Sequence, residues 1–361
     1  MQSGEPIDRL HPHDPLRTPA EAGYGEAVSE RATGVRVAVT GPTGTFGFAL
    51  MPRLQAERRI ARIVGLARRP FEPAEHGWTK MEYLRGDVRE PETLRRAFEG
   101  ADVVVHLAFM ITGAASRETI RQINVEGTLN AFRAAASAGA RRFVYASSVA
   151  AYGFHSENPL GMNEEWPARP AAHLFYAQEK AEIEQLLTDE AGRLPELELY
   201  LLRPPIVLGP HAVGAKSFLP RPLEPLARRL ASLVLGLPVP LPVPAPRLPL
   251  QLIHEDDVAE AFMLCILGAG APGAYNIAAD GTVTTGEIAR ELGFAPLPVP
   301  AAPVQSAARL VAAIPFAPPF AEWAEAASHP AIMDTSKAKR ELGWSPRYSA
   351  LEALRVTLSG T

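Results

Sequence analysis

The chain has 361 residues, 47% of them hydrophobic, and its 36 Lys and Arg residues against 40 Asp and Glu give a formal net charge of -4. This size and hydrophobic content suffice for a large core, in one two-lobed domain or two modest ones. The small net charge gives no electrostatic basis for binding nucleic acid. Cys265 is the only cysteine, which excludes an intrachain disulfide and a thiolate metal cluster. We therefore expect a reducing, cytoplasmic location.

The first segment, residues 1–34, is rich in Pro, His, Glu and Gly. It contains no apolar stretch long enough for a signal peptide or a membrane span, so we predict a flexible tail and no membrane partner. His11 and His13 alternate like a metal-binding pair, but no further ligand is near them in the sequence. We therefore predict surface histidines and no metal site.

A glycine-rich loop follows a short β-rich run, Val35–Thr40, and precedes an apolar, helix-compatible segment, Phe48–Leu54. Strand, glycine loop and helix occur in the order that a dinucleotide-binding fingerprint requires, with the spacing GxxGxxG. Gly41 would allow the tight turn, Gly44 would let the backbone approach a pyrophosphate, and Gly47 would let helix and strand pack closely. The alternative is a glycine-rich turn in an ordinary α/β protein. The cofactor contacts expected here are Gly41, Thr43, Gly44, Thr45, Phe46 and Gly47.

The second predicted strand bears on the choice of dinucleotide. The run Arg62–Leu66 ends in Ala67, Arg68 and Arg69, where a carboxylate usually holds the ribose hydroxyls of NAD. Guanidinium groups at this place suit a 2′-phosphate, which Arg can bind through two parallel hydrogen bonds. The sequence therefore favours NADP over NAD. The alternative is that Arg68 and Arg69 are solvated surface charges.

Three side chains further along predict a hydride-transfer site. The run Arg142–Ala146 is typical of a buried parallel strand, which places Ser148 at the strand's carboxyl end, where ligands of open α/β sheets bind. Ala177–Leu187 is predicted as a helix, so Tyr176 and Lys180 share one face, and the cation would lower the pKa of the phenol. Such a tyrosine can exchange a proton with an alcohol or carbonyl oxygen of the substrate, and Ser148 would hydrogen-bond the same oxygen. The alternative is that these are common helix and loop patterns.

The second half of the chain contains two proline-rich apolar stretches, Leu223–Leu250 and Phe294–Phe320. Regularly spaced prolines forbid a continuous helix in the first stretch, predict an extended segment and exclude a membrane span. The second stretch carries Val304–Ile314, which could form a short helix with one apolar face. Together they would wall a pocket for a small-molecule substrate. A core-packing surface or the surface of a homodimer is the alternative.

In the order and spacing of its motifs, the chain from Val35 onward resembles the extended short-chain dehydrogenase/reductase superfamily, in its NAD-dependent epimerase/dehydratase group. The resemblance implies an α/β fold: a Rossmann-type doubly wound parallel sheet with a smaller C-terminal substrate-binding lobe. It also implies that Ser148, Tyr176 and Lys180 are catalytic and that the Lys180 ammonium hydrogen-bonds the nicotinamide ribose. Asn124 matches a helix asparagine of mainly structural role. Further cofactor contacts implied by the resemblance are Arg68, Arg69, Asp87, Val88, Leu107, Ala108, Tyr176, Lys180 and Pro204.

The resemblance also predicts how the chain is divided. Residues 35–210 would form the NAD(P)-binding domain, to which residues 251–280 return. Residues 211–250 and 281–361 would form the substrate-binding lobe. Leu252–Val258 and Asp334–Trp344 resemble two signatures that occur late in the fold.

Two departures from the family pattern bear on the substrate. Ser148 is followed by Val149 and Ala150, where the family's sugar-nucleotide dehydratases have an Asp-Glu pair, so dehydration is disfavoured. Leu250 stands where the epimerases have an arginine that holds a diphosphate, which removes the most direct partner of that group.

The sequence leaves three functions open. The first is an NADP-dependent reductase or dehydrogenase of a weakly charged carbonyl or alcohol, such as a sterol-like ketone. The second is a nucleotide-sugar epimerase or reductase, which would gain support if Arg203, Arg221 or Arg247 lined a phosphate site. The third is a dinucleotide-binding protein without catalytic activity. The retained residues Ser148, Tyr176 and Lys180 argue against the third.

Overall fold

The computed structural model describes residues 34–111, 115–172, 174–212, 240–300 and 329–359. Contacts divide the chain into Met1–Thr33 and Gly34–Thr361, and the fold below is that of the second unit. The predicted tail, most of the first proline-rich stretch and the helix expected at Val304–Ile314 lie outside the described residues.

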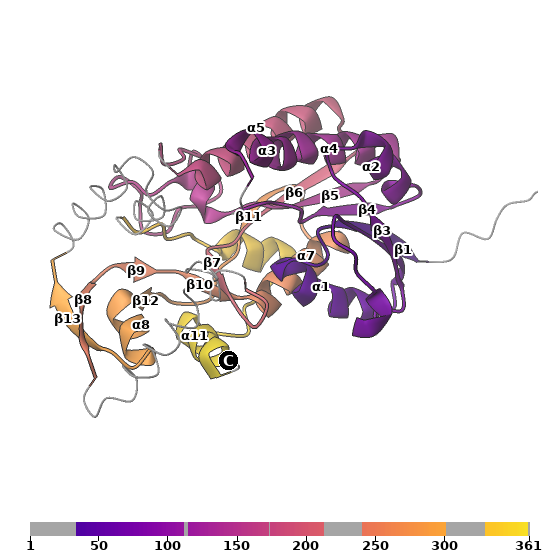
Figure 1. Cartoon of the computed structure of the whole chain (residues 1–361). Helices are drawn as coiled ribbons and strands as arrows, with labels where there is room; N and C mark the ends of the chain where they lie inside the picture. The colour runs from indigo at the N-terminus through magenta and orange to yellow at the C-terminus, as the bar shows by residue number, and fades with distance from the viewer. Residues whose placement is uncertain (1–33, 112–114, 173, 213–239, 301–328, 360–361) are drawn as a thin grey trace, which may run out of the picture. The chain divides into compact units, whose positions relative to one another are not determined.

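A seven-stranded parallel sheet forms the centre of this unit, with the strand order β11-β6-β5-β4-β1-β2-β3 (Figure 1). The order reverses direction between β1 and β4, which is the point where open α/β sheets leave a crevice for ligands at the strands' carboxyl ends. The Rossmann-type fold expected from the sequence is confirmed. The strands are β1 (Val35–Thr40), β2 (Ile60–Ala67), β3 (Met81–Arg85), β4 (Val103–His106), β5 (Arg142–Ala146), β6 (Glu198–Arg203) and β11 (Gly273–Asn276).

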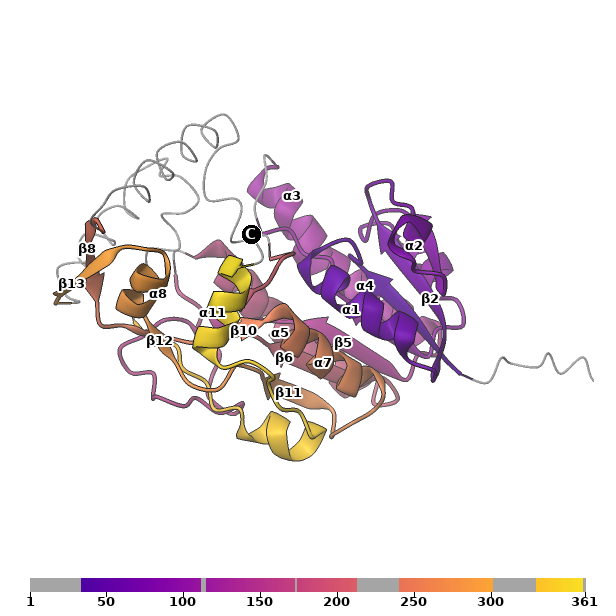
Figure 2. The same cartoon turned by 90° about the horizontal axis from the view of Figure 1, so that it is seen from below.

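Helices cover both faces of the sheet, because every strand near its centre is apolar on both sides. On one face, α1 (Thr45–Ala56) packs against α7 (Glu255–Ile266), and the two lie side by side in Figure 2. On the other face lie α2 (Pro91–Phe98), α4 (Gly127–Ser137) and α5 (Phe175–Arg193). The short helices η1 (Pro73–His76), α3 (Arg117–Arg121), η2 (Gln122–Glu126) and η3 (Val149–Tyr152) complete this half.

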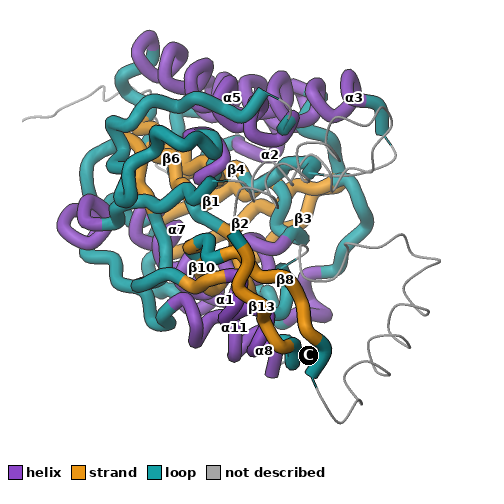
Figure 3. Tube along the Cα trace, turned by 90° about the vertical axis from the view of Figure 1, so that its left-hand side faces the viewer, coloured by secondary structure: helices purple, strands orange, loops and turns teal. Residues whose placement is uncertain are grey.

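The remaining elements of the described residues form three two-stranded pairs, two α-helices and one π-helical turn (Figure 3). Prolines alternate along β8 (Pro242–Pro246), which pairs only with β13 (Ala295–Val299). Since proline cannot donate a backbone hydrogen bond, such strands suit small pairs and not the middle of a sheet. The extended conformation predicted for this part of the proline-rich stretch is confirmed. The other elements are β7 (Ile206–Leu208) with β10 (Leu252–His254), β9 (Pro249–Leu250) with β12 (Val283–Thr284), α8 (Thr285–Glu291), η7 (Ala338–Leu342) and α11 (Ala350–Ser359).

The segment around Trp344 lies against the sheet half of the molecule, although sequence analysis assigns it to the substrate-binding lobe. Leu342 and Trp344 belong to the same core cluster as α1 and α7. The Trp344 indole donates a 2.9 Å hydrogen bond to the Asp257 carbonyl of α7. A buried indole needs such an acceptor, and α7 supplies it.

Candidate active site

The glycine loop begins where β1 ends, and its backbone explains two of its three glycines. Gly41 has φ +71°, a left-handed conformation that favours glycine, and a Cβ there would lie 2.8 Å from the Ala108 nitrogen. A Cβ on Gly47 would lie 2.2 Å from the Pro42 carbonyl oxygen. Gly47 therefore allows close contact between α1 and the glycine loop. The sequence had suggested a close contact between the helix and the strand.

The third glycine leaves the beginning of α1 open. Gly44 is the N-cap of α1, and a Cβ there would meet only the Gly41 carbonyl oxygen, at 3.4 Å. In α1, which the structure describes along its whole length, the first turn has no acidic residue and no side chain caps it. Amides at a helix N-terminus bind anionic oxygens, so the loop fits the pyrophosphate of a dinucleotide.

Arginines gather at the carboxyl ends of β2 and β3. Arg68 and Arg69 are exposed just beyond β2, and the Arg85 side chain donates a 3.1 Å hydrogen bond to the Arg68 carbonyl. Burial raises the pKa of Asp87, but hydrogen bonds from Arg89 and the charge of Arg68 outweigh it and leave the pKa below its usual value. Arg68 therefore lies close enough to Asp87, one of the expected cofactor contacts, to interact with it electrostatically.

The loop after β4 lies directly beside the glycine loop. The Leu107 amide donates to the Thr40 carbonyl at 3.0 Å, and the Ala108 amide donates to the Thr40 hydroxyl at 3.3 Å. Val88 is buried in the core under α2 and α4. On the other side, the Val149 amide donates to the Pro204 carbonyl at 3.0 Å, which holds the end of β6 next to Ser148.

Ser148 and Tyr176 come together at the carboxyl end of β5. Ser148 caps η3, and its hydroxyl accepts a 3.2 Å hydrogen bond from the Ala150 amide. Tyr176 is the second residue of α5, which begins earlier and ends later than the predicted helix. Burial raises the pKa of Tyr176, and a hydrogen bond with Ser148 offsets part of this rise. The phenol is therefore neutral at neutral pH.

Lys180 does not lower the pKa of Tyr176, contrary to the sequence expectation. Its ammonium donates to the Ala146 carbonyl at 2.6 Å and to the Tyr145 hydroxyl at 3.1 Å, and lies 5.8 Å from the centre of the Tyr176 ring. Burial lowers the pKa of Lys180 to about 7, against the raising effects of Glu184 and Glu179. The ammonium is thus directed to β5 and not to the Tyr176 hydroxyl. Burial therefore determines the direction in which the pKa of Tyr176 is shifted.

Phe109 also belongs to this site, although no motif of the sequence includes it. The Lys180 ammonium lies 3.7 Å from the centre of the Phe109 ring, and this ring meets the Tyr176 ring edge-on at 5.5 Å. Asn124 holds the loop: its side chain accepts from the Met110 amide at 2.7 Å and donates to the Met110 carbonyl at 3.0 Å. Asn124 therefore has the structural role that the family resemblance implied.

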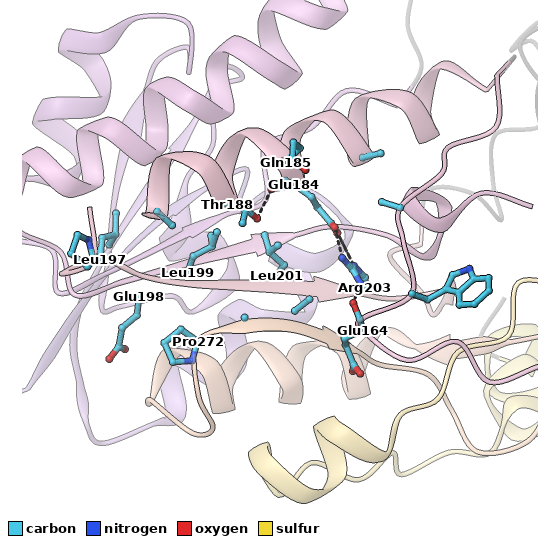
Figure 4. Close-up of a pocket in the computed structure, with 17 residues that line it drawn as sticks. Glu164, Glu184, Gln185, Thr188, Leu197, Glu198, Leu199, Leu201, Arg203 and Pro272 are labelled. Atoms are coloured by element: carbon cyan, nitrogen blue, oxygen red, sulfur yellow. Dashed lines mark hydrogen bonds and ion pairs between the residues drawn. The ribbon is translucent and has the colours of Figure 1, made fainter. Parts of the chain in front are cut away.

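A cavity of about 560 Å³ lies along the second half of α5, beside β6 and β11 (Figure 4). Leu199 and Leu201 line it, together with Glu184 and Arg203. Arg203 and Glu184 form a buried ion pair at 2.5 Å, and the Ser147 hydroxyl donates to the same carboxylate. Arg203 is therefore committed to Glu184 and does not replace a diphosphate-binding arginine.

The other positions considered for a diphosphate are Leu250, Arg247 and Arg221. Leu250 lies in β9, pairs with Val283 and packs in an apolar cluster. Arg247 is exposed, and Arg221 lies outside the described residues. Within the described ranges, no helix is long and apolar enough to cross a bilayer, and no group of three His, Cys, Asp or Glu side chains could hold a metal ion.

Comparison with known proteins identifies the family. The family model for the NAD dependent epimerase/dehydratase family matches residues 37–278, which is most of the described chain. The chain belongs to this family. As a member, it is an NAD(P)-dependent enzyme of the extended short-chain dehydrogenase/reductase type, and an epimerase activity fits the match as well.

Three similar proteins illustrate the range of this epimerase/dehydratase family. The uncharacterized protein y4nG of Sinorhizobium fredii is 28% identical over 319 residues, or 86% of this chain and 74% of y4nG. Sterol demethylase protein B of Methylococcus capsulatus is 33% identical over 175 residues, or 48% of this chain and 51% of its own. The structure of Thermus thermophilus UDP-glucose 4-epimerase in complex with NAD is 25% identical, with a TM-score of 0.64, covering 90% of this chain and 98% of its own.

Proposed function

We propose that this family member transfers a hydride between NADP(H) and a weakly charged carbonyl or alcohol, with Ser148, Tyr176 and Lys180 around the reacting atoms. The observation that carries the proposal is the hydrogen bond between Tyr176 and Ser148 beside the buried Lys180 ammonium. These groups lie at the carboxyl end of β5, and only β4 separates β5 from β1, the strand that leads into the glycine loop. Ligands of open α/β sheets bind at that end.

The bound dinucleotide would supply or accept the hydride. Because the pKa of Tyr176 is raised by burial, its phenol keeps its proton at neutral pH and can donate it to a substrate oxygen. The Ser148 hydroxyl would donate a second hydrogen bond to the same oxygen and stabilise the charge that develops there. A protonated phenol is the acid that reduction of a carbonyl requires.

The preference for NADP rests on Arg68 and Arg69. Both side chains are exposed at the end of β2, and Arg85 fixes the backbone of Arg68 by a 3.1 Å hydrogen bond. A 2′-phosphate would find guanidinium groups here where NAD-binding relatives of the fold offer a carboxylate. The family match by itself supports only a nicotinamide dinucleotide.

An apolar substrate is favoured by two of the positions considered for a diphosphate, Arg203 and Leu250. Arg203 is paired with Glu184, and Leu250 packs among apolar side chains. A diphosphate without paired cations would be poorly bound. Similarity to sterol demethylase protein B over 48% of this chain supports a sterol-like ketone as the substrate class. The single buried thiol, Cys265, suits the reducing cytoplasm that we propose as its location.

The second candidate is a nucleotide-sugar epimerase, favoured by the likeness to Thermus thermophilus UDP-glucose 4-epimerase. Two measurements separate the candidates. Oxidation of NADPH is followed with a panel of apolar ketones and aldehydes, and calorimetry measures the binding of UDP and dTDP. We expect NADPH oxidation and nucleotide affinities weaker than about millimolar. Micromolar binding of either nucleotide would overturn the apolar substrate and favour the epimerase.

A further inference from the structure

The Phe109 ring covers the Lys180 ammonium inside the proposed active site. The nitrogen lies 3.7 Å from the ring centre, closer than to the rings of Tyr145, at 4.7 Å, and Tyr176, at 5.8 Å. A cation over an aromatic face is attracted by the ring quadrupole, and the attraction is larger when water is excluded. Lys180 is almost completely buried, so Phe109 replaces water on one side of the ammonium.

The position of this ring is built into the fold. Phe109 follows β4, and the next residue, Met110, has both backbone groups bound by the Asn124 side chain. The same Asn124 amide donates to Glu179 of α5 at 2.6 Å, which ties the loop to the helix of Lys180. Asn124 is fully buried in η2, a π-helical turn, and such turns often occur at functional sites. The loop is therefore fixed relative to α5.

Burial and the aromatic face act in opposite directions on Lys180. Burial disfavours the charged ammonium, whereas an aromatic face favours it. The ionisable groups that face or influence this nitrogen come from β4, β5 and α5. They are His106, Tyr145, Tyr176, Glu179 and Glu184.

We propose that Phe109 is a positioning residue of the active site, whose ring keeps the Lys180 ammonium charged and held against β5. The inference rests on the proposed function and on the hydrogen bond to the nicotinamide ribose that the family resemblance implies for this ammonium. The ring also separates the nitrogen from solvent on the side of the loop after β4. Loss of the aromatic face would let the amine lose its proton at a lower pH.

The test measures dinucleotide affinity against pH, and therefore needs no substrate. NADH binding is followed by the fluorescence of the reduced nicotinamide between about pH 5.5 and 9. This range extends to both sides of the pKa of Lys180, which burial lowers to about 7. NADH is used because the 2′-phosphate of NADPH itself titrates near about pH 6. In the unmodified protein, affinity should fall as pH rises through the pKa of Lys180, because the neutral amine loses its charged hydrogen bond.

The decisive variant is Phe109→Leu, which keeps apolar volume but removes the aromatic face. We expect the inflection to move to lower pH by about one unit. Phe109→Tyr keeps an aromatic face and should keep the inflection near that of the unmodified protein. An unchanged inflection in Phe109→Leu, with thermal unfolding showing a folded protein, would overturn the role of Phe109.

Lys180→Met separates this inference from the proposed function. Loss of the inflection in Lys180→Met assigns the titration to Lys180, and the Phe109 variants then decide the inference. If Lys180→Met binds NADH with the same pH dependence as the unmodified protein, the contact of Lys180 with the dinucleotide is refuted, and the inference with it. If the inflection vanishes in Lys180→Met but stays unchanged in Phe109→Leu, only the inference fails.

Discussion

The Arg203 guanidinium and the Glu184 carboxylate form an ion pair at 2.5 Å in which both side chains are almost fully buried, 8% and 5% exposed. Arg203 also donates to the Tyr152 hydroxyl at 2.6 Å, and Glu184 accepts from Ser147. The pair thus connects β6, α5 and the residue next to Ser148. A charge left alone at this place would have no solvent to stabilise it.

Arg203→Met should therefore destabilise the fold strongly. It leaves Glu184 buried without its partner, which costs about 3–5 kcal/mol in the free energy of unfolding. Arg133→Met is the matched control, because Arg133 pairs with Glu190 at 2.7 Å on the surface, with 55% of its side chain exposed. That change should cost less than about 1 kcal/mol. Denaturant unfolding measures both, and equal losses would contradict the role of burial.

Tyr176→Phe should remove the proton donor. We expect turnover to fall on the order of a hundredfold or more, with dinucleotide affinity nearly unchanged, because the hydroxyl acts in the transition state. Steady-state kinetics and fluorescence titration separate the two effects. Tyr200→Phe is the control, since its hydroxyl donates to the Gly270 carbonyl at 3.1 Å and should affect turnover little. Full activity of Tyr176→Phe would end the catalytic assignment.

Ser148→Ala should mainly lower turnover as well. The Ser148 hydroxyl would donate a hydrogen bond to the reacting oxygen, and its loss should lower turnover on the order of a hundredfold to a thousandfold. The hydrogen bond from Ser148 also offsets part of the rise in the pKa of Tyr176. Its loss should shift the pH profile of kcat/KM, which reports the enzyme without substrate, to higher pH, a change that a purely structural serine would not cause.

Arg68→Ala should abolish most of the preference for NADPH over NADH. A charged hydrogen bond of this type is worth about 1.5–3 kcal/mol, so the preference should be on the order of tenfold to a hundredfold. Arg58→Ala is the control, because Arg58 is exposed just before β2, at the opposite end of the strand. Titration with both dinucleotides measures the effect. Equal affinities in the unmodified protein would refute the NADP assignment.

His106 should make the fold sensitive to acid. Burial and the Lys180 charge lower the pKa of His106 to about 3, while its nitrogens lie 2.9 Å and 3.0 Å from the Thr40 and Thr128 hydroxyls. The unfolded chain then binds more protons than the folded one between about pH 6.5 and 3, so stability is lost as pH falls through this window. His106→Gln should remove this part of the pH dependence, whereas His76→Gln, at an exposed position, should keep it.

The pH dependence of unfolding by denaturant checks this prediction. Each proton taken up contributes a slope of at most about 1.4 kcal/mol per pH unit. A slope in His106→Gln equal to that of the unmodified protein would show that carboxylates alone cause the acid sensitivity.

The sequence by itself determined the parts of this protein that depend on local geometry. The left-handed turn at Gly41 needs glycine, and the order of strand, glycine loop and helix follows from short-range patterns. The spacing of Tyr176 and Lys180 places both on one face of α5 in any helix. These features fix the sheet, the family and the position of the proposed catalytic residues at the carboxyl end of β5.

Only the tertiary structure decided which side chains those residues meet. Lys180 bonds to Tyr145 and lies over Phe109, and each contact joins segments that the crossovers of the sheet bring together. The same holds for Arg203, which the sequence left open as a phosphate ligand and which Glu184 binds instead. The pKa of Tyr176 is raised by burial, whereas the sequence led to the expectation that the neighbouring ammonium lowers it. Such effects depend on desolvation by distant parts of the chain, which local patterns do not record.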